Sequence, residues 1–72
     1  MPRPPRVSGR ETVRALEKFG FRQVRQRGSH VVLRKGSIGC VVPMHDELAT
    51  GTLLGLLKQA GVTLDDFRKA LK

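Results

Sequence analysis

The 72-residue sequence predicts an α+β fold in which one helix is followed by a three-stranded antiparallel sheet and then by one or two helices. Two β-branched runs, 30–34 and 38–42, stand between segments whose apolar residues have helical spacing. Turn residues at 28–29 and 35–37 divide the middle of the chain into three pieces of strand length. We therefore expect the helices to pack on one face of the sheet and to leave the other face free for a ligand.

The first helix is expected over about residues 9–19. Ser8 and Glu11 have the spacing of a capping box, in which each side chain accepts a hydrogen bond from the other residue's backbone. Gly20 can adopt the left-handed conformation that ends a helix, and Phe21 can then pack back on the last turn. The apolar stripe of this helix consists of Val13, Leu16 and Phe19.

The three strands are expected to form a meander of antiparallel pairs. Residues 21–27 alternate imperfectly, with Val24 as the clearest inward-facing residue of a half-exposed strand. Pro43 has no amide proton for a ladder hydrogen bond, so the third strand should end there or lie at an edge of the sheet. A loop is expected over residues 44–51.

Two helices are expected after this loop. Gly61 should end the first of them, and Thr63 can cap a short last helix. The apolar side of the first consists of Leu53, Leu54, Leu56 and Leu57.

The chain is expected to form one domain over residues 7–72, preceded by a mobile, basic, Pro-rich arm over residues 1–6. Its longest apolar runs, 31–33 and 40–44, fall far short of the roughly 20 residues that cross a bilayer. No apolar segment follows the basic opening, as a secretory signal would require. We therefore expect a cytoplasmic protein.

A metal or cofactor site is not expected. Cys40 is the single cysteine, so a disulfide within the chain is excluded. The simplest interpretation of Cys40 is a small core residue. His45, Asp46 and Glu47 follow it closely in sequence. One cysteine and two histidines, however, cannot supply the paired ligand spacing of a structural zinc site.

The positive charge is concentrated in one half of the chain. The sequence has 14 Lys and Arg against 6 Asp and Glu, for a net charge of +8. Residues 1–35 hold ten basic and two acidic side chains, whereas residues 36–72 hold four of each. Such asymmetry attracts phosphate groups or an acidic protein, although a solvated basic face that aids solubility would look the same.

The two histidines are the candidates for chemistry. Histidine exchanges a proton near neutral pH, and RNA supplies its own nucleophile in the 2′-hydroxyl, so RNA cleavage needs little beyond a base, an acid and cations. His30 follows a turn, and His45 follows the third strand. A histidine in a surface turn without a catalytic role remains the alternative for each. The cations nearest His30 in the sequence are Arg25, Arg27, Arg34 and Lys35.

The order of several motifs resembles that of the HicA toxins over about residues 7–68. These motifs are Ser8-x-x-Glu11, Gly20-Phe21, Arg25-Gln26-x-Gly28-Ser29-His30, Val42-Pro43-x-His45 and Leu57-Lys58-Gln59-Ala60-Gly61. The resemblance implies a fold similar to double-stranded RNA-binding domains. It also implies a metal-independent endoribonuclease that cuts mRNA, and a HicB-type antitoxin as the partner that blocks it.

The resemblance further implies site residues. His30 corresponds to the catalytic histidine of the family. Our hypothesis is that His30 takes the proton of the 2′-hydroxyl while nearby arginines hold the scissile phosphate. Gly28 and Ser29 would shape the turn that presents His30, and His45 is a structural or auxiliary candidate. The residues expected to bind RNA are Arg25, Arg27, Arg34 and Lys35.

Two other functions are compatible with the sequence. A non-catalytic module could grip double-stranded RNA with the same basic surface, and His30 would then only contact a phosphate or a 2′-hydroxyl. A protein-interaction module could instead dock an acidic partner without meeting nucleic acid. Stable RNA binding without product would indicate the first, and binding of an acidic protein by a chain that ignores RNA would indicate the second.

Overall fold

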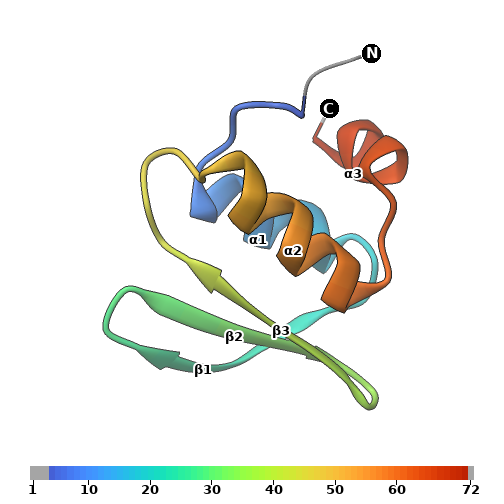
Figure 1. Cartoon of the computed structure of the whole chain (residues 1–72). Coiled ribbons are helices and arrows are strands. Elements are labelled where there is room, and N and C mark those ends of the chain that lie inside the picture. Colours follow the sequence, from blue (N-terminus) through green and yellow to red (C-terminus); the bar gives the residue numbers. More distant parts are fainter. Residues whose placement is uncertain (1–3, 72) are drawn as a thin grey trace.

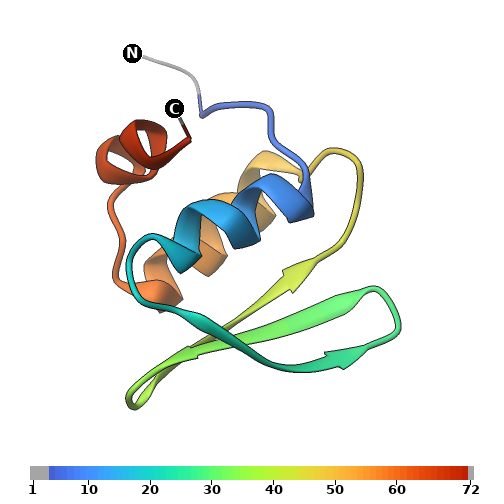
Figure 2. The ribbon, with the colours of Figure 1, turned by 180° about the vertical axis from the view of Figure 1, so that it is seen from behind.

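The computed structural model describes residues 4–71 and confirms the α+β fold. Its elements are α1 (Gly9–Glu17), β1 (Arg22–Arg27), β2 (His30–Lys35), β3 (Ile38–Pro43), α2 (Thr50–Ala60) and α3 (Leu64–Ala70). The antiparallel sheet has the order β1-β2-β3. Figures 1 and 2 show each described helix on the same side of this sheet. The order is consistent with the topology of a double-stranded RNA-binding domain.

The start and end of α1 follow the local signals in the sequence. The backbone N–H of Glu11 donates to Ser8 Oγ at 3.0 Å, and the backbone N–H of Ser8 donates to Glu11 Oε1 at 3.0 Å, which completes the capping box. The regular helix ends at Glu17, two residues before the expected end, and passes into a turn. Gly20 has a φ of +95° there, and Phe21 is buried behind it.

The pairing of β1 with β2 contains a β-bulge at Val24. The pairs on either side of the bulge are Gln23 with Leu33 and Arg25 with Val32, so Val24 has no partner of its own. A bulge interrupts the alternation of side chains between the two faces of a sheet. Val24 is 49% exposed, and the prediction that it faces inward is therefore wrong.

The position of the helices gives a second reason for this exposure. α1 and α2 pack mainly over β3, and every residue of β1 is exposed. β3 is an edge strand whose last residue is Pro43, as the missing amide proton of proline predicts.

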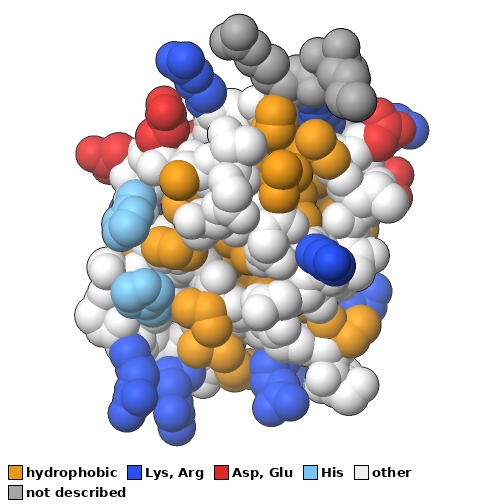
Figure 3. All heavy atoms as spheres, viewed as in Figure 1, with side chains coloured by type: hydrophobic (Ala, Val, Ile, Leu, Met, Phe, Trp, Pro, Cys, Tyr) orange, Lys and Arg blue, Asp and Glu red, His pale blue; other side chains and the backbone are white. Residues whose placement is uncertain are grey.

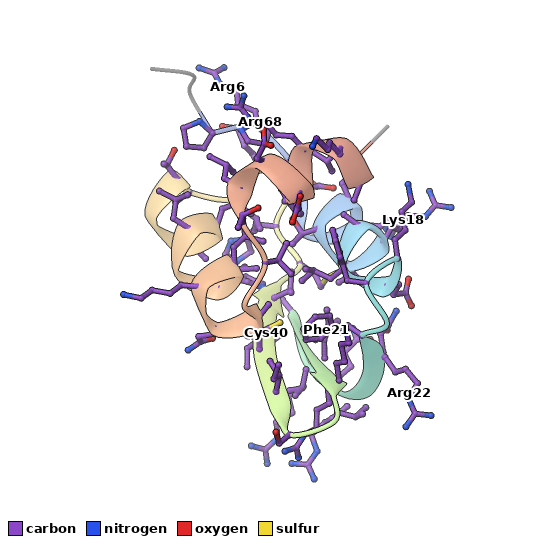
Figure 4. The ribbon with its side chains drawn as sticks, turned by 90° about the vertical axis from the view of Figure 1, so that its right-hand side faces the viewer. Arg6, Lys18, Phe21, Arg22, Cys40 and Arg68 are labelled. Carbon is purple, nitrogen blue, oxygen red and sulfur yellow. The ribbon has the colours of Figure 1, made fainter. Side chains whose placement is uncertain are left out.

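The hydrophobic core lies between the sheet and the helices. Phe21 and Cys40 lie in this layer in Figure 4, and the burial of Cys40 confirms its assignment to the core. Phe67 brings α3 into the same core and is fully buried. The other large contributors are Val13, Leu16, Val31, Leu33, Val42, Leu53, Leu56 and Leu57.

The last two helices differ from expectation mainly where α2 begins. It starts at Thr50, inside the expected loop, and Leu54 is 41% exposed rather than part of the core. Gly61 ends α2 with a φ of +73°, and Thr63 Oγ1 accepts a hydrogen bond from the N–H of Asp66 at 3.1 Å, so both expected signals are confirmed.

α3 is also tied to α1 by a side chain. Lys18 Nζ donates to the backbone carbonyl of Ala70 at 2.6 Å, which places a cation at the negative end of α3. Figure 4 shows Lys18 at the end of α1.

Residues 4–6 of the expected arm are described by the structure. Pro4 and Pro5 are half-buried and line a depression together with residues 47–50. Residues 1–3 of that arm and Lys72 lie outside the described part of the chain. The division into an arm and a domain stays a prediction.

The first turn of α1 is in direct contact with the end of β3. The N–H of Gly9 donates to the carbonyl of His45 at 2.9 Å. A Cβ atom at Gly9 would lie 2.1 Å from the carbonyl oxygen of Pro43 and 2.8 Å from Met44 Cα, both of which are backbone atoms. Only a glycine therefore permits this helix to approach the strand so closely.

We predict that Gly9→Ala lowers the free energy of unfolding by about 1–3 kcal/mol, because the added methyl must push apart two backbone segments. Urea denaturation followed by circular dichroism measures this change. Gly55→Ala in α2 is the matched control, since a Cβ there meets nothing within 4 Å. Alanine should stabilise that helix by about 0.5–1 kcal/mol. A Gly9→Ala variant as stable as Gly55→Ala would contradict the close contact.

Candidate functional site

His30 is held at one corner of the sheet. It is the first residue of β2 and lies opposite Arg27 of β1 and Pro43 of β3. The preceding turn contains Gly28, whose φ of +55° favours glycine, and Gln26 Nε2 donates to the Gly28 carbonyl at 3.2 Å. The Gly28–Ser29 turn therefore places an exposed histidine at the start of the strand, as the sequence predicts.

The second histidine is brought to the same corner by backbone hydrogen bonds. The N–H of Met44 donates to the carbonyl of Ser29 at 2.5 Å, which joins the segment after β3 to the turn before His30. The next residue, His45, is fixed to α1 through its carbonyl, which accepts from Gly9. Figure 3 shows both histidines on the same side of the molecule.

His45 also lines a shallow depression of about 360 Å³ at the start of α1. Its other lining residues are Ser8, Arg10, Met44 and Asp46. Arg10 thus adds a cation near His45 that the sequence reasoning did not include among the site residues.

Three of the four predicted RNA-binding residues share one face with His30. Successive strand residues point to opposite faces, so His30 and Arg34 lie on the face opposite to buried Val31 and Leu33. Residues paired across a sheet share a face, which places Arg25 and Arg27 there as well, opposite Val32 and His30. We call this helix-free side the outer face.

Lys35 lies apart from the other predicted RNA-binding residues. It stands at the opposite end of β2 from His30, about 16 Å along the strand. The alternation turns Lys35 away from the outer face. Its side chain lies beside Gly20, where an added Cβ would be 3.4 Å from Lys35 Cε.

The charge on the sheet is of one sign. No acidic residue occurs between Glu17 and Asp46, so all three strands carry only cationic or uncharged side chains. Figure 3 shows Lys and Arg but no Asp or Glu at the end of the molecule formed by the sheet, whereas Asp and Glu lie toward the helices among other Lys and Arg side chains. This separation produces a positive potential over the outer face, which attracts polyanions.

Apolar side chains interrupt this cationic face. Val24 is 49% exposed and Val41 is 44% exposed. Val32 pairs with Val41 on one side and with Arg25, the neighbour of Val24, on the other. The sequence reasoning missed this set because it placed Val24 in the core. The alternation in β2 and β3 would have identified the other two as outward-facing residues.

The described residues form neither a metal cluster nor a reactive cysteine site. Within residues 4–71 no three His, Cys, Asp or Glu side chains come together as a metal site would require. No helix in this part of the chain is long and apolar enough to cross a membrane. Burial raises the pKa of the Cys40 thiol, which disfavours the reactive thiolate.

The chain matches a known protein family. A family model described as "HicA toxin of bacterial toxin-antitoxin" matches residues 9–62, which extend from the start of α1 to just past the end of α2. The matched region contains both histidines and the whole sheet. No curated protein sequence gives a match.

We predict that Cys40 reacts slowly with iodoacetamide at about pH 8 in the folded protein and rapidly in urea. The raised pKa of Cys40 favours the neutral thiol in the folded state. The resulting contribution to the stability of the folded protein is complete below the thiol pKa of the unfolded chain and is lost as the pH rises through the folded pKa. Mass spectrometry of the labelled protein follows the reaction. Equal labelling rates with and without urea would show that the thiol is accessible.

Proposed function

The chain belongs to the HicA toxin family of bacterial toxin–antitoxin systems, and we propose that it is a metal-independent endoribonuclease that cuts mRNA. The observation that carries this proposal is the position of His30. An exposed histidine lies on a sheet face that holds four arginines, one of them Arg22 opposite Arg34, and no acid. This arrangement supplies a base beside cations, which is what cleavage by the 2′-hydroxyl of RNA needs.

His30 acts as the general base in this proposal. Its imidazole takes the proton of a 2′-hydroxyl, and the 2′-oxygen attacks the adjacent phosphorus. The bond from phosphorus to the 5′-oxygen then breaks, which leaves a 2′,3′-cyclic phosphate and a 5′-hydroxyl. Arg27, opposite His30, and the neighbouring Arg25 and Arg34 neutralise the charge that develops on the phosphoryl oxygens.

His45 is the auxiliary group in this proposal. The departing 5′-oxygen needs a proton, and a second histidine at the same corner can donate it. The hydrogen bonds of Met44 to Ser29 and of Gly9 to His45 support this role, because they fix the backbone of His45 relative to the turn before His30. Gly28 and Ser29 position the base and do not take part in proton transfer.

The antitoxin is the second expected partner. Membership of a toxin–antitoxin family implies such a partner, and we propose a HicB-type protein that covers His30 and acts in the cytoplasm, where mRNA is found. An acidic partner would be attracted to the outer face, and its association rate would fall with added salt.

We predict that His30→Ala reduces RNA cleavage by at least about 10²-fold, because the general base is lost, and leaves folding unchanged, because His30 is exposed. The assay uses partner-free protein, a long mRNA and a metal chelator from about pH 5 to pH 9. His45→Ala should retain part of the activity and shift the alkaline limb of the pH profile. Full cleavage by His30→Ala would exclude the proposed base.

Tight RNA binding without product by folded wild-type protein would exclude catalysis altogether. That outcome would instead identify a non-catalytic RNA-binding module. Failure to bind RNA, together with binding of an acidic protein, would identify a protein-interaction module.

We predict that Arg27→Ala lowers kcat/KM for RNA by about tenfold, because a charge-assisted hydrogen bond to phosphate is lost. Lys58→Ala is the matched control, since it removes one exposed positive charge from α2, far from the outer face. The slope of log Kd against log salt should fall by about one for Arg27→Ala only. Equal effects of the two substitutions would show that net charge, rather than this position, determines binding.

A further inference from the structure

The β-bulge places two consecutive side chains of β1 on the outer face. A regular strand would send neighbouring residues to opposite faces. Here Val24 and Arg25 together line one shallow depression of about 420 Å³, with Val32 and Arg34 of β2 as its other walls. The bulge thus adds an apolar side chain to a position that already holds a cation.

The apolar part of this depression continues across the sheet. Val32 pairs with Arg25 on one side and with Val41 of β3 on the other. Val24, Val32 and Val41 therefore form a strip across three strands, with Arg25 and Arg34 beside it. We call these five residues the valine–arginine surface.

The exposure of this strip is informative in so small a protein. A 72-residue chain has few apolar side chains for its core, yet Val24 and Val41 are 49% and 44% exposed. A cluster of exposed apolar side chains next to a cationic site is typical of a binding surface.

The valine–arginine surface lies directly beside the proposed base. Val32 and His30 are two residues apart on the same face of β2, which corresponds to about 6.6 Å along the strand. A ligand that occupies the surface therefore lies next to the group that His30 acts on.

We propose that the valine–arginine surface binds one unstacked nucleobase of the RNA substrate, adjacent to the scissile phosphate. The inference rests on the proposed function and adds a substrate-binding subsite to it. The base would lie with one face on the valines, and an arginine would stack on it or donate to its edge. Proteins that read single-stranded RNA hold splayed bases in this way, and a guanidinium plane can replace an aromatic ring.

The charges favour RNA over a protein as the occupant. All the charged side chains of the sheet are basic, and both arginines of the surface share its face with Arg27 and His30. A single nucleotide can contact both parts of such a site, because the faces of its base are apolar and its phosphate is anionic. A protein would need an apolar side chain bordered by several carboxylates in the matching arrangement.

The experiment couples a change in the protein to a change in the RNA. The variant Val24→Thr/Val41→Thr keeps the β-branched shape that strands favour and replaces a methyl by a hydroxyl at two exposed positions. Ile38→Thr is the matched control, because Ile38 is 40% exposed but pairs with Lys35 at the other end of β2. All three substitutions are made in the His30→Ala background, so that RNA is bound but not cut.

The RNA probes are a set of short single strands of the same sequence. Each member of the set lacks the base at one position, and the unmodified strand is the reference. Fluorescence anisotropy gives Kd for every protein with every RNA. Removal of the contacted base should weaken binding to the parent protein and to Ile38→Thr by about fivefold to tenfold. The same removal should change Kd for Val24→Thr/Val41→Thr by less than about twofold, because the contact is already lost.

The outcomes separate this inference from the proposed function. Coupling at one RNA position supports the subsite, and the absence of coupling at every position overturns it, whether or not the wild-type protein cleaves RNA. If wild-type protein does not cleave RNA but the coupling is observed, the nuclease proposal is rejected and the base-binding surface is retained. If the valine variant binds every RNA normally and loses affinity for an acidic antitoxin, the surface is a protein interface and the proposal is wrong.

Discussion

The close contact between the first turn of α1 and the end of β3 determines how the other parts of the molecule are arranged. Gly9 has no side chain, so the helix approaches the backbone of Pro43 and Met44 directly. The same segment donates a hydrogen bond to Ser29, which joins the helical layer, the edge strand and the turn before β2 in one unit. Both histidines are attached to this unit. The geometry of the candidate site is thus a consequence of backbone packing.

The limited size of the helical layer explains why the sheet is so exposed. α1 and α2 pack over β3, and α3 packs on α1, so no described helix remains to bury β1. An exposed edge strand risks pairing with other chains, and charged residues and bulges reduce that risk. β1 has both, in the form of three arginines and the bulge at Val24. The features that protect the edge also create the cationic outer face.

Local signals in the sequence predicted the element order, the caps of α1 and α3, and the turn that presents His30. Such signals depend on residues that are a few positions apart, so they can be identified without knowledge of the tertiary contacts. The bulge at Val24 depends on strand register, which the sequence alone did not reveal. The separation of Lys35 from the other site cations follows from its place at the far end of β2 and from the alternation of that strand. The proximity of the two histidines depends on the bond between Met44 and Ser29, fifteen positions apart in the chain. Sequence reasoning identified both residues but had no means to place them together.

The charge that suits the outer face for a polyanion also acts on the free domain. Arg25, Arg27 and Arg34 lie on one face without an acidic neighbour, and their mutual repulsion lowers the stability of a chain whose core is already small. A ligand that neutralises these charges and binds the folded state more tightly than the unfolded state stabilises the fold by mass action. RNA and an acidic antitoxin would both have this effect. The same arginines thus lower the stability of the free domain and raise its affinity for an anionic partner, which links folding to binding at this face.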